Sequence, residues 1–188
     1  MLKYIEEFGK YVLITGFRNA KTLNFEELFG VVRKELPKSV EVQIFDARFV
    51  ATWQHLYFAV LNALTAFKNK GNISKTLAME SMLYASAQRQ IRKAMKSLGI
   101  KPQTSEIAVV MVGEKPEILD SALSTVSAHI KAPLDEVVLE LSNEKVKSVQ
   151  EVFGISDVEI EAIMGKDGLE EALTNLVIER MALLSTQR

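Results

Sequence analysis

Residues 46–100 read DARFVATWQHLYFAVLNALTAFKNKGNISKTLAMESMLYASAQRQIRKAMKSLGI and contain two long helical patterns joined by a polar turn at residues 68–74. Apolar side chains in the first pattern, from Phe49 to Phe67, recur at steps of three and four residues, which is the period of one helix face. The second pattern repeats this period at Met79, Leu83, Ala87, Ile91, Met95 and Leu98. The stretch therefore predicts two helices that pack against a core, the second over residues 76–98.

The opposite side of the second predicted helix is cationic. At 100° per residue, Arg89, Arg92, Lys93 and Lys96 fall together, away from the apolar positions. Residues 68–101 hold eight cations against one carboxylate, whereas residues 102–188 hold seven cations against sixteen carboxylates. The formal net charge of −1 for the whole chain hides this separation of charge.

A concentrated basic block indicates an anionic partner such as nucleic acid. The alternative is a solvated helix face that pairs with the acidic C-terminal third of the chain. Free N–H groups at the start of the second helix, beside Lys75, would suit a phosphate. Arg89 can pair with a phosphate or stack on a base. The polar residues at 86–90 also allow a simpler interpretation, in which they only accommodate a bend.

Length and composition indicate a soluble globular protein. A chain of 188 residues with 48% hydrophobic and 25% charged residues fits one domain, or one domain with a small appendage. No apolar run approaches the roughly 20 residues that a membrane span needs, and the N-terminus does not resemble a secretory signal. The absence of cysteine excludes disulfides and thiolate metal sites and favours a cytoplasmic location.

Strand patterns alternate with helical ones along the chain, which is typical of the α/β class. We predict one mixed β-sheet of about four or five strands with helices packed on it, plus a helical C-terminal appendage. The division is an α/β body over residues 1–154 and an extension over 155–188, which opens with a capping box at Ser156 and Glu159. The strands are expected at residues 10–17, 40–46, 106–113 and 136–141, and further helices at 24–36, 116–130 and 143–153.

Catalytic and cofactor motifs are absent from the sequence. There is no phosphate-binding loop, no dinucleotide fingerprint and no nucleophile elbow, and Gly16 is interpreted as part of a turn that ends a strand. His55 and His129 lack a histidine partner three or four residues away, so no metal site is predicted. His55 is expected to be a packed or surface residue rather than a base. The sequence predicts neither an enzyme nor a cofactor.

The same stretch also resembles a known family, the kinase-binding subunit of the KEOPS complex (the TPRKB-type family), especially its archaeal members. The resemblance covers about residues 10–155, is strongest over 46–113 and contains no catalytic residue. One departure is Ala87, which stands where the family has glycine. The matching residues are Asp46, Ala47, Val50, Ala51, Thr52, His55, Ile73, Ser74, Glu80, Leu83, Ser86, Gln90, Ile91 and Ala94, with the apolar runs at 107–112 and 138–141.

This resemblance implies a non-catalytic subunit that binds the small protein kinase/ATPase of KEOPS and supports its activity. That complex makes threonylcarbamoyladenosine in tRNAs that read codons starting with A, and archaeal members also bind the single-stranded 3′ CCA end of tRNA. We therefore expect a kinase partner at an unidentified surface, a tRNA partner, and neither a membrane nor a DNA partner. The RNA-binding residues are expected to be Lys75, Arg89, Gln90, Arg92, Lys93 and Lys96.

Two alternatives remain open from the sequence. The first is an interaction protein that activates the kinase without contacting RNA. The second is a small-molecule enzyme of unrecognised type that uses His55 or a carboxylate in a cleft.

Overall fold

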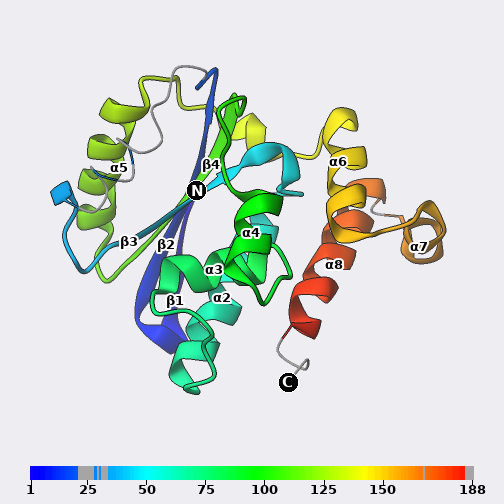
Figure 1. Cartoon of the computed structure of the whole chain (residues 1–188), viewed down its shortest axis with the longest axis horizontal. Helices are drawn as coiled ribbons and strands as arrows, with labels where there is room; N and C mark the ends of the chain where they lie inside the picture. Colours follow the sequence, from blue (N-terminus) through cyan, green and yellow to red (C-terminus); the bar gives the residue numbers. More distant parts are fainter. Residues whose placement is uncertain (21–27, 29, 31–33, 167, 185–188) are drawn as a thin grey trace.

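A computed structural model describes residues 1–20, 28, 30, 34–166 and 168–184 of the protein. At its centre lies one four-stranded sheet in the order β1-β2-β4-β3 (Figure 1). The α/β class, with helices packed on a single sheet and helices at the C-terminus, is confirmed. The three strand pairings are all antiparallel, whereas a mixed sheet was expected. The strands are β1 (Leu2–Ile5), β2 (Lys10–Arg18), β3 (Glu41–Asp46) and β4 (Glu106–Gly113).

Strand β4 is the central strand that its apolar sequence predicts. It pairs with β2 on one side and β3 on the other, and it is buried on both faces. Its even-numbered side chains, such as Ala108 and Val110, enter a larger core, while odd-numbered ones such as Val109 and Met111 enter a smaller one. This two-sided burial explains why its sequence is continuously apolar rather than alternating.

Helices cover both faces of the sheet, and α5 lies on the side opposite most of the others in Figure 1. Helix α5 (Pro116–Ile130) contributes Leu119 and Val126 to the smaller core. The predicted helix at residues 24–36 lies largely outside the described residues. None of the described helices is long and apolar enough to cross a membrane. The larger core is shared by α2 (Trp53–Lys68), α3 (Leu77–Ala85), α4 (Ile91–Leu98), α6 (Asn143–Phe153), α7 (Asp157–Ile163) and α8 (Gly168–Leu183).

The edge of β2 differs from the sequence-based expectation. Strand β1, which was not predicted, pairs with its first half, and residues 136–141 do not form the predicted strand. They contain the 3₁₀ helix η3 (Glu136–Leu139), because the Asp135 carboxylate accepts a hydrogen bond from the Val137 amide and starts a tight turn. Gly16 lies within β2 rather than in a turn. A Cβ atom there would lie 2.1 Å from a Val138 methyl carbon, so glycine lets η3 pack against the strand.

The predicted helix over residues 76–98 is two helices, α3 and α4, separated by residues 86–90. Helix α3 ends in a Schellman motif, in which the Ala87 amide donates to the Tyr84 carbonyl and the Gln88 amide to the Leu83 carbonyl. Ala87 takes the left-handed position of this motif, with φ of +50°. Ile91 leaves the apolar stripe and is 46% exposed, because the break turns α4 relative to α3.

Candidate nucleic-acid interface

The solvent face of α4 carries three of the predicted RNA-binding cations. Arg92, Lys93 and Lys96 are exposed, while Ala94 and Leu98 on the other side of the helix are fully buried. In the part of the chain that the structure describes, no ion pair includes any of these three cations. This face of α4 therefore presents positive charge to solvent, and none of its three cations pairs with a described carboxylate.

Arg89 and Gln90 lie in the break immediately before α4 and are also exposed. The guanidinium Nη1 of Arg89 donates a hydrogen bond of 3.3 Å to the Leu184 carbonyl oxygen, just beyond the end of α8. This contact joins the break to the C-terminal helix. The hydrogen bond fixes the Arg89 guanidinium next to the start of α4 and its exposed cations.

A cavity of about 250 Å³ adjoins Arg89. Its walls come from the C-terminal half of α2, the loop that follows α2, the end of α3 with the break after it, and the residue just beyond α8. The lining combines amide side chains with a phenol and an exposed isoleucine, groups that can hydrogen-bond to and pack against an unstacked base. The residues that line it include Asn62, Asn69, Ile73, Tyr84, Arg89 and Leu184.

The loop before α3 is anchored by a buried carboxylate. Glu80, which is fully buried, accepts hydrogen bonds from the Ile73 amide at 3.0 Å and the Ser74 amide at 2.7 Å. In α3 itself, the Ala78 amide donates to a Glu41 carboxylate oxygen at 3.1 Å. Two amides of the first turn are therefore already bound, Ala78 to the Glu41 carboxylate and Met79 to the Thr76 hydroxyl, so neither is free for a phosphate as the sequence suggested.

The structure brings most, but not all, of the predicted RNA-binding residues together. Arg89 and Gln90 precede α4 directly, and the three α4 cations follow within two turns. Lys75 is exposed but lies just before the N-terminus of α3, whereas Arg89 follows its C-terminus. The nine residues of this helix separate its two ends by about 14 Å. Lys75 therefore borders the same loop as Ile73 rather than the α4 face.

His55 is a packed residue. It is fully buried, its Nδ1 accepts a hydrogen bond from the Ala51 amide at 3.2 Å, and its Nε2 donates to the Ala85 carbonyl oxygen at 2.7 Å. Burial lowers the pKa of the imidazole to about 4. With both nitrogens bound to backbone groups, His55 has no accessible atom with which to act on a substrate.

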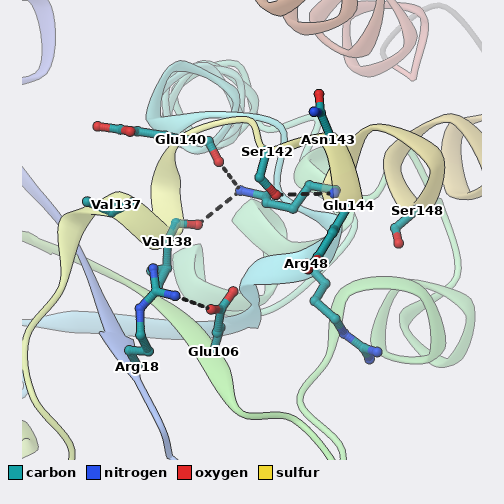
Figure 2. Close-up of a pocket in the computed structure, with 11 residues that line it drawn as sticks. Arg18, Arg48, Glu106, Val137, Val138, Glu140, Ser142, Asn143, Glu144 and Ser148 are labelled. Atoms are coloured by element: carbon teal, nitrogen blue, oxygen red, sulfur yellow. Dashed lines mark hydrogen bonds and ion pairs between the residues drawn. The ribbon is translucent and has the colours of Figure 1, made fainter.

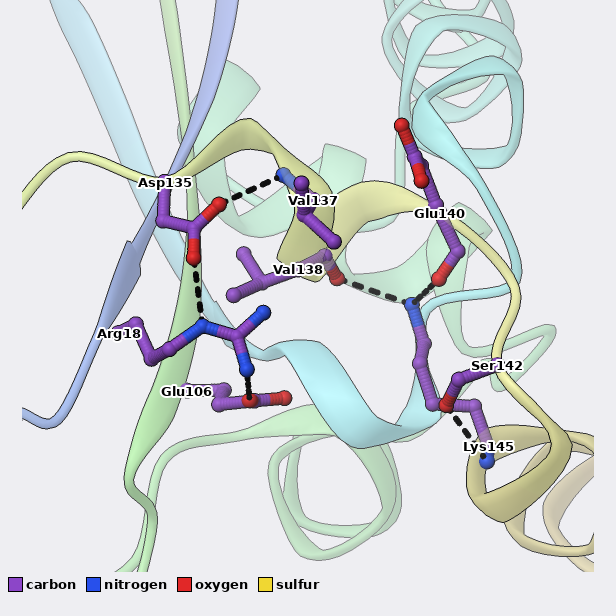
Figure 3. Close-up of polar contacts among 8 residues, drawn as sticks. All are labelled: Arg18, Glu106, Asp135, Val137, Val138, Glu140, Ser142 and Lys145. Atoms are coloured by element: carbon purple, nitrogen blue, oxygen red, sulfur yellow. Dashed lines mark hydrogen bonds and ion pairs between the residues drawn. The ribbon is translucent and has the colours of Figure 1, made fainter.

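A second cavity, of about 500 Å³, lies between β2, η3 and α6 (Figure 2). Lys145 reaches into it from α6 and donates hydrogen bonds of 2.9 Å to the carbonyl oxygens of Val138 and Glu140. Burial lowers the pKa of this amine to about 8. Beside it, Arg18 pairs with Asp135 at 2.5 Å and with Glu106 at 3.0 Å (Figure 3).

Several polar groups that line this second cavity are already bound to neighbouring groups of the protein. Arg18 and Lys145 connect η3 to β2 and α6, so their contacts hold the segment that replaces the predicted fourth strand. Lys145 was missed from the sequence, although it lies four residues before Val149 and eight before Phe153, on the buried side of α6. Over the described residues, no group of three or more His, Asp or Glu side chains is placed to hold a metal ion.

Comparison with known proteins gives two matches. A family model described as "Kinase binding protein CGI-121" matches residues 17–185. The chain is also similar to the "Regulatory protein Cgi121" of Methanocaldococcus jannaschii, with 31% identity over 144 residues, which cover 77% of this chain and 85% of that protein.

Proposed function

The chain belongs to the CGI-121 family, and on that premise we propose that it is a regulatory subunit that binds a protein kinase and also contacts tRNA. The kinase is the small kinase/ATPase of a cytoplasmic KEOPS complex. The RNA is the single-stranded 3′ CCA end of the tRNA that this complex modifies. In this role the chain contributes binding surfaces and no catalytic group.

The kinase part of the proposal is supported by the family. The matching model is described by kinase binding, and the relative from Methanocaldococcus jannaschii is described as a regulatory protein. The model match spans residues 17–185, which includes β3, β4 and helices α2 to α8, although it begins after β1 and near the end of β2. A regulatory role toward a kinase therefore rests on similarity along nearly the whole chain.

The RNA part is supported by one observation above all, the exposed cationic face of Arg92, Lys93 and Lys96 next to the cavity beside Arg89. Proteins that bind single-stranded nucleic acid combine a positively charged track for the phosphates with pockets or platforms for unstacked bases. Here α4 supplies the charge, and the cavity beside Arg89 supplies a site of limited size. The two features together favour a strand end over a regular duplex.

Anisotropy with labelled tRNA tests this proposal. We compare the wild type with a variant carrying Arg92→Glu, Lys93→Glu and Lys96→Glu, using intact tRNA and tRNA that lacks the 3′ CCA. The variant is expected to bind intact tRNA at least about tenfold more weakly, because it loses up to three phosphate contacts. A matched control reverses Lys38, Lys115 and Lys147, which are exposed on other elements.

The outcomes separate the two parts of the proposal. Equal affinity of the wild type for both tRNAs, or equal loss in both triple variants, contradicts the CCA contact. If the wild type binds neither tRNA while kinase binding persists, the chain is a kinase-activating protein without RNA contact. If the wild type does not bind the kinase in size-exclusion chromatography after co-expression, the regulatory role itself is wrong.

A further inference from the structure

The buried ammonium of Lys145 lacks a counter-charge. Lys145 is only 5% exposed, and no described carboxylate lies within ion-pairing distance of its Nζ. Two of its three N–H groups donate to the carbonyl oxygens of Val138 and Glu140, and the third has no partner among the described residues (Figure 3). Buried charges in proteins are normally paired, because burial without an opposite charge is costly.

The carboxylates nearest to Lys145 do not supply this charge. Glu106 pairs with Arg18 at 3.0 Å, and the exposed carboxylate of Glu140 points away from the amine (Figure 3). Burial lowers the pKa of Lys145 to about 8, and the more distant charges of Glu106, Glu170 and Glu140 offset this effect only in part. The cation therefore lines the second cavity with its charge uncompensated.

The first turn of α6 lines the same cavity. Asn143 and Glu144 are the first two residues of this helix, and their backbone amides donate no hydrogen bond within the described chain. Unpaired amides at a helix N-terminus attract anions. Two independent features of one cavity, a buried cation without a counter-ion and a helix start with unpaired amides, therefore favour an anionic ligand.

The other lining residues limit the kind of anion that fits. A monoanion balances the one uncompensated ammonium, whereas a phosphate dianion adds a second charge that the neighbouring carboxylates repel. Val137 lines the cavity and is 55% exposed, so it offers an apolar surface. The volume of about 500 Å³ lies within the range of small-molecule sites. The charged side chains of the lining are Arg18, Arg48, Lys145, Glu106, Glu140 and Glu144.

We propose that this cavity binds a small organic monocarboxylate, independently of the proposed kinase and tRNA contacts. One carboxylate oxygen accepts the third N–H group of Lys145, and the other accepts the unpaired amides of the first turn of α6. The apolar part of the ligand packs on Val137. The ligand thereby supplies the counter-charge that the described chain lacks at Lys145.

Calorimetric titration with butyrate, inorganic phosphate and butyramide tests this site. Butyrate is expected to bind at least about tenfold more tightly than phosphate, and the neutral butyramide is expected not to bind. Lys145→Met should weaken butyrate binding at least about tenfold, because the charge-assisted hydrogen bond is lost. The matched control is Lys147→Met, which removes an exposed cation from the same helix and should leave butyrate affinity unchanged.

Asn143→Pro tests the helix start without altering Lys145. Proline suits the first position of a helix, and Ser142 before it already has the extended backbone that proline requires, with φ of −99° and ψ of 160°. This variant is expected to fold like the wild type and to bind butyrate about threefold or more weakly, because it lacks one amide donor. Asn143→Ala keeps the amide and should bind butyrate like the wild type.

The amine of Lys145 gives a readout besides affinity. A carboxylate beside Nζ favours the charged form, so saturating butyrate should raise the pKa of Lys145 above about 8 in NMR titrations of its side chain. Absence of butyrate binding, or wild-type affinity in both Lys145→Met and Asn143→Pro, overturns the site. Tighter binding of phosphate than of butyrate contradicts the monocarboxylate assignment. Each of these results leaves the kinase and tRNA proposals untouched, because neither contact uses this cavity.

Discussion

The imidazole of His55 donates a hydrogen bond of 2.7 Å to the carbonyl oxygen of Ala85, across 30 residues of sequence. Ala85 is the last residue of α3, where backbone carbonyls lose their partners within the helix. Because Nδ1 of the same ring accepts the Ala51 amide, one buried side chain joins the segment before α2 to the end of α3. The buried His55 side chain therefore stabilises the break at residues 86–90, which sets the orientation of α4 and its cations.

Stability should therefore depend on pH through His55. The folded protein keeps this imidazole neutral, with a pKa of about 4, whereas the unfolded chain protonates near the ordinary value of about 6.5. The unfolded state then binds more protons between these values, so the stabilisation is complete above pH 6.5 and is lost as the pH falls toward 4. Urea unfolding at several pH values should show a loss on the order of 3 kcal/mol.

The second histidine provides the control for this pH dependence. His129 lies on α5, where its Nε2 is 3.3 Å from a Glu35 carboxylate oxygen in an exposed contact. His129→Gln should keep the slope of stability against pH between 4 and 6.5, and His55→Gln should flatten it. A slope that survives His55→Gln would show that other groups cause the acid destabilisation.

Ala87→Gly should stabilise the protein. Ala87 has φ of +50° in the Schellman motif that ends α3, a conformation that is unfavourable for residues with a Cβ atom. After allowance for the greater freedom of glycine in the unfolded chain, the expected gain is about 0.5–1 kcal/mol in urea unfolding. Ala85→Gly, two residues earlier within α3, should instead destabilise by about 1 kcal/mol, because its backbone is helical.

Gly16→Ala should destabilise the protein through η3. The added methyl carbon would lie 2.1 Å from a Val138 methyl carbon and 2.8 Å from the Asp135 carbonyl oxygen, so the 3₁₀ segment must shift from β2. Overpacking of this kind costs about 1–3 kcal/mol. Gly71→Ala provides the comparison, since nothing lies within 4 Å of a Cβ atom there. A loss in Gly71→Ala equal to that in Gly16→Ala would contradict the steric explanation.

Much of the fold follows from the sequence where burial alone determines the pattern. The apolar run of β4 and the three- and four-residue steps of α2 predict elements whose type the structure confirms. The capping box of Ser156 and Glu159 is present at the start of α7, because it depends only on local hydrogen bonds. Strand β1 was missed because it has only four residues, of which the first three are exposed.

The errors occur where a tertiary contact overrides a local pattern. The apolar run around Val138 resembles a strand, but the Asp135 carboxylate and the close approach to Gly16 fold it into η3. The break before α4 has no glycine to mark it, since Ala87 takes the left-handed position. Glu80 appears in the sequence as the single acid of a basic block, although it lies three residues before the buried Leu83. Its burial under the loop amides depends on geometry that spacing alone does not reveal.

The α4 cations should determine how tRNA affinity responds to salt. Each phosphate contact on a single strand contributes roughly 0.7 to the slope of log affinity against log salt concentration, because binding releases condensed counterions. Arg92→Ala and Lys93→Ala should each reduce that slope by about 0.7, and the double variant by about 1.4, if each side chain contacts one phosphate. Both side chains are exposed, so unfolding free energies should change little. Lys147→Ala on α6 removes the same charge from another exposed site and should leave the slope unchanged. A slope unaffected by the α4 changes would mean that these cations do not neutralise phosphates, whatever the affinity of the wild type.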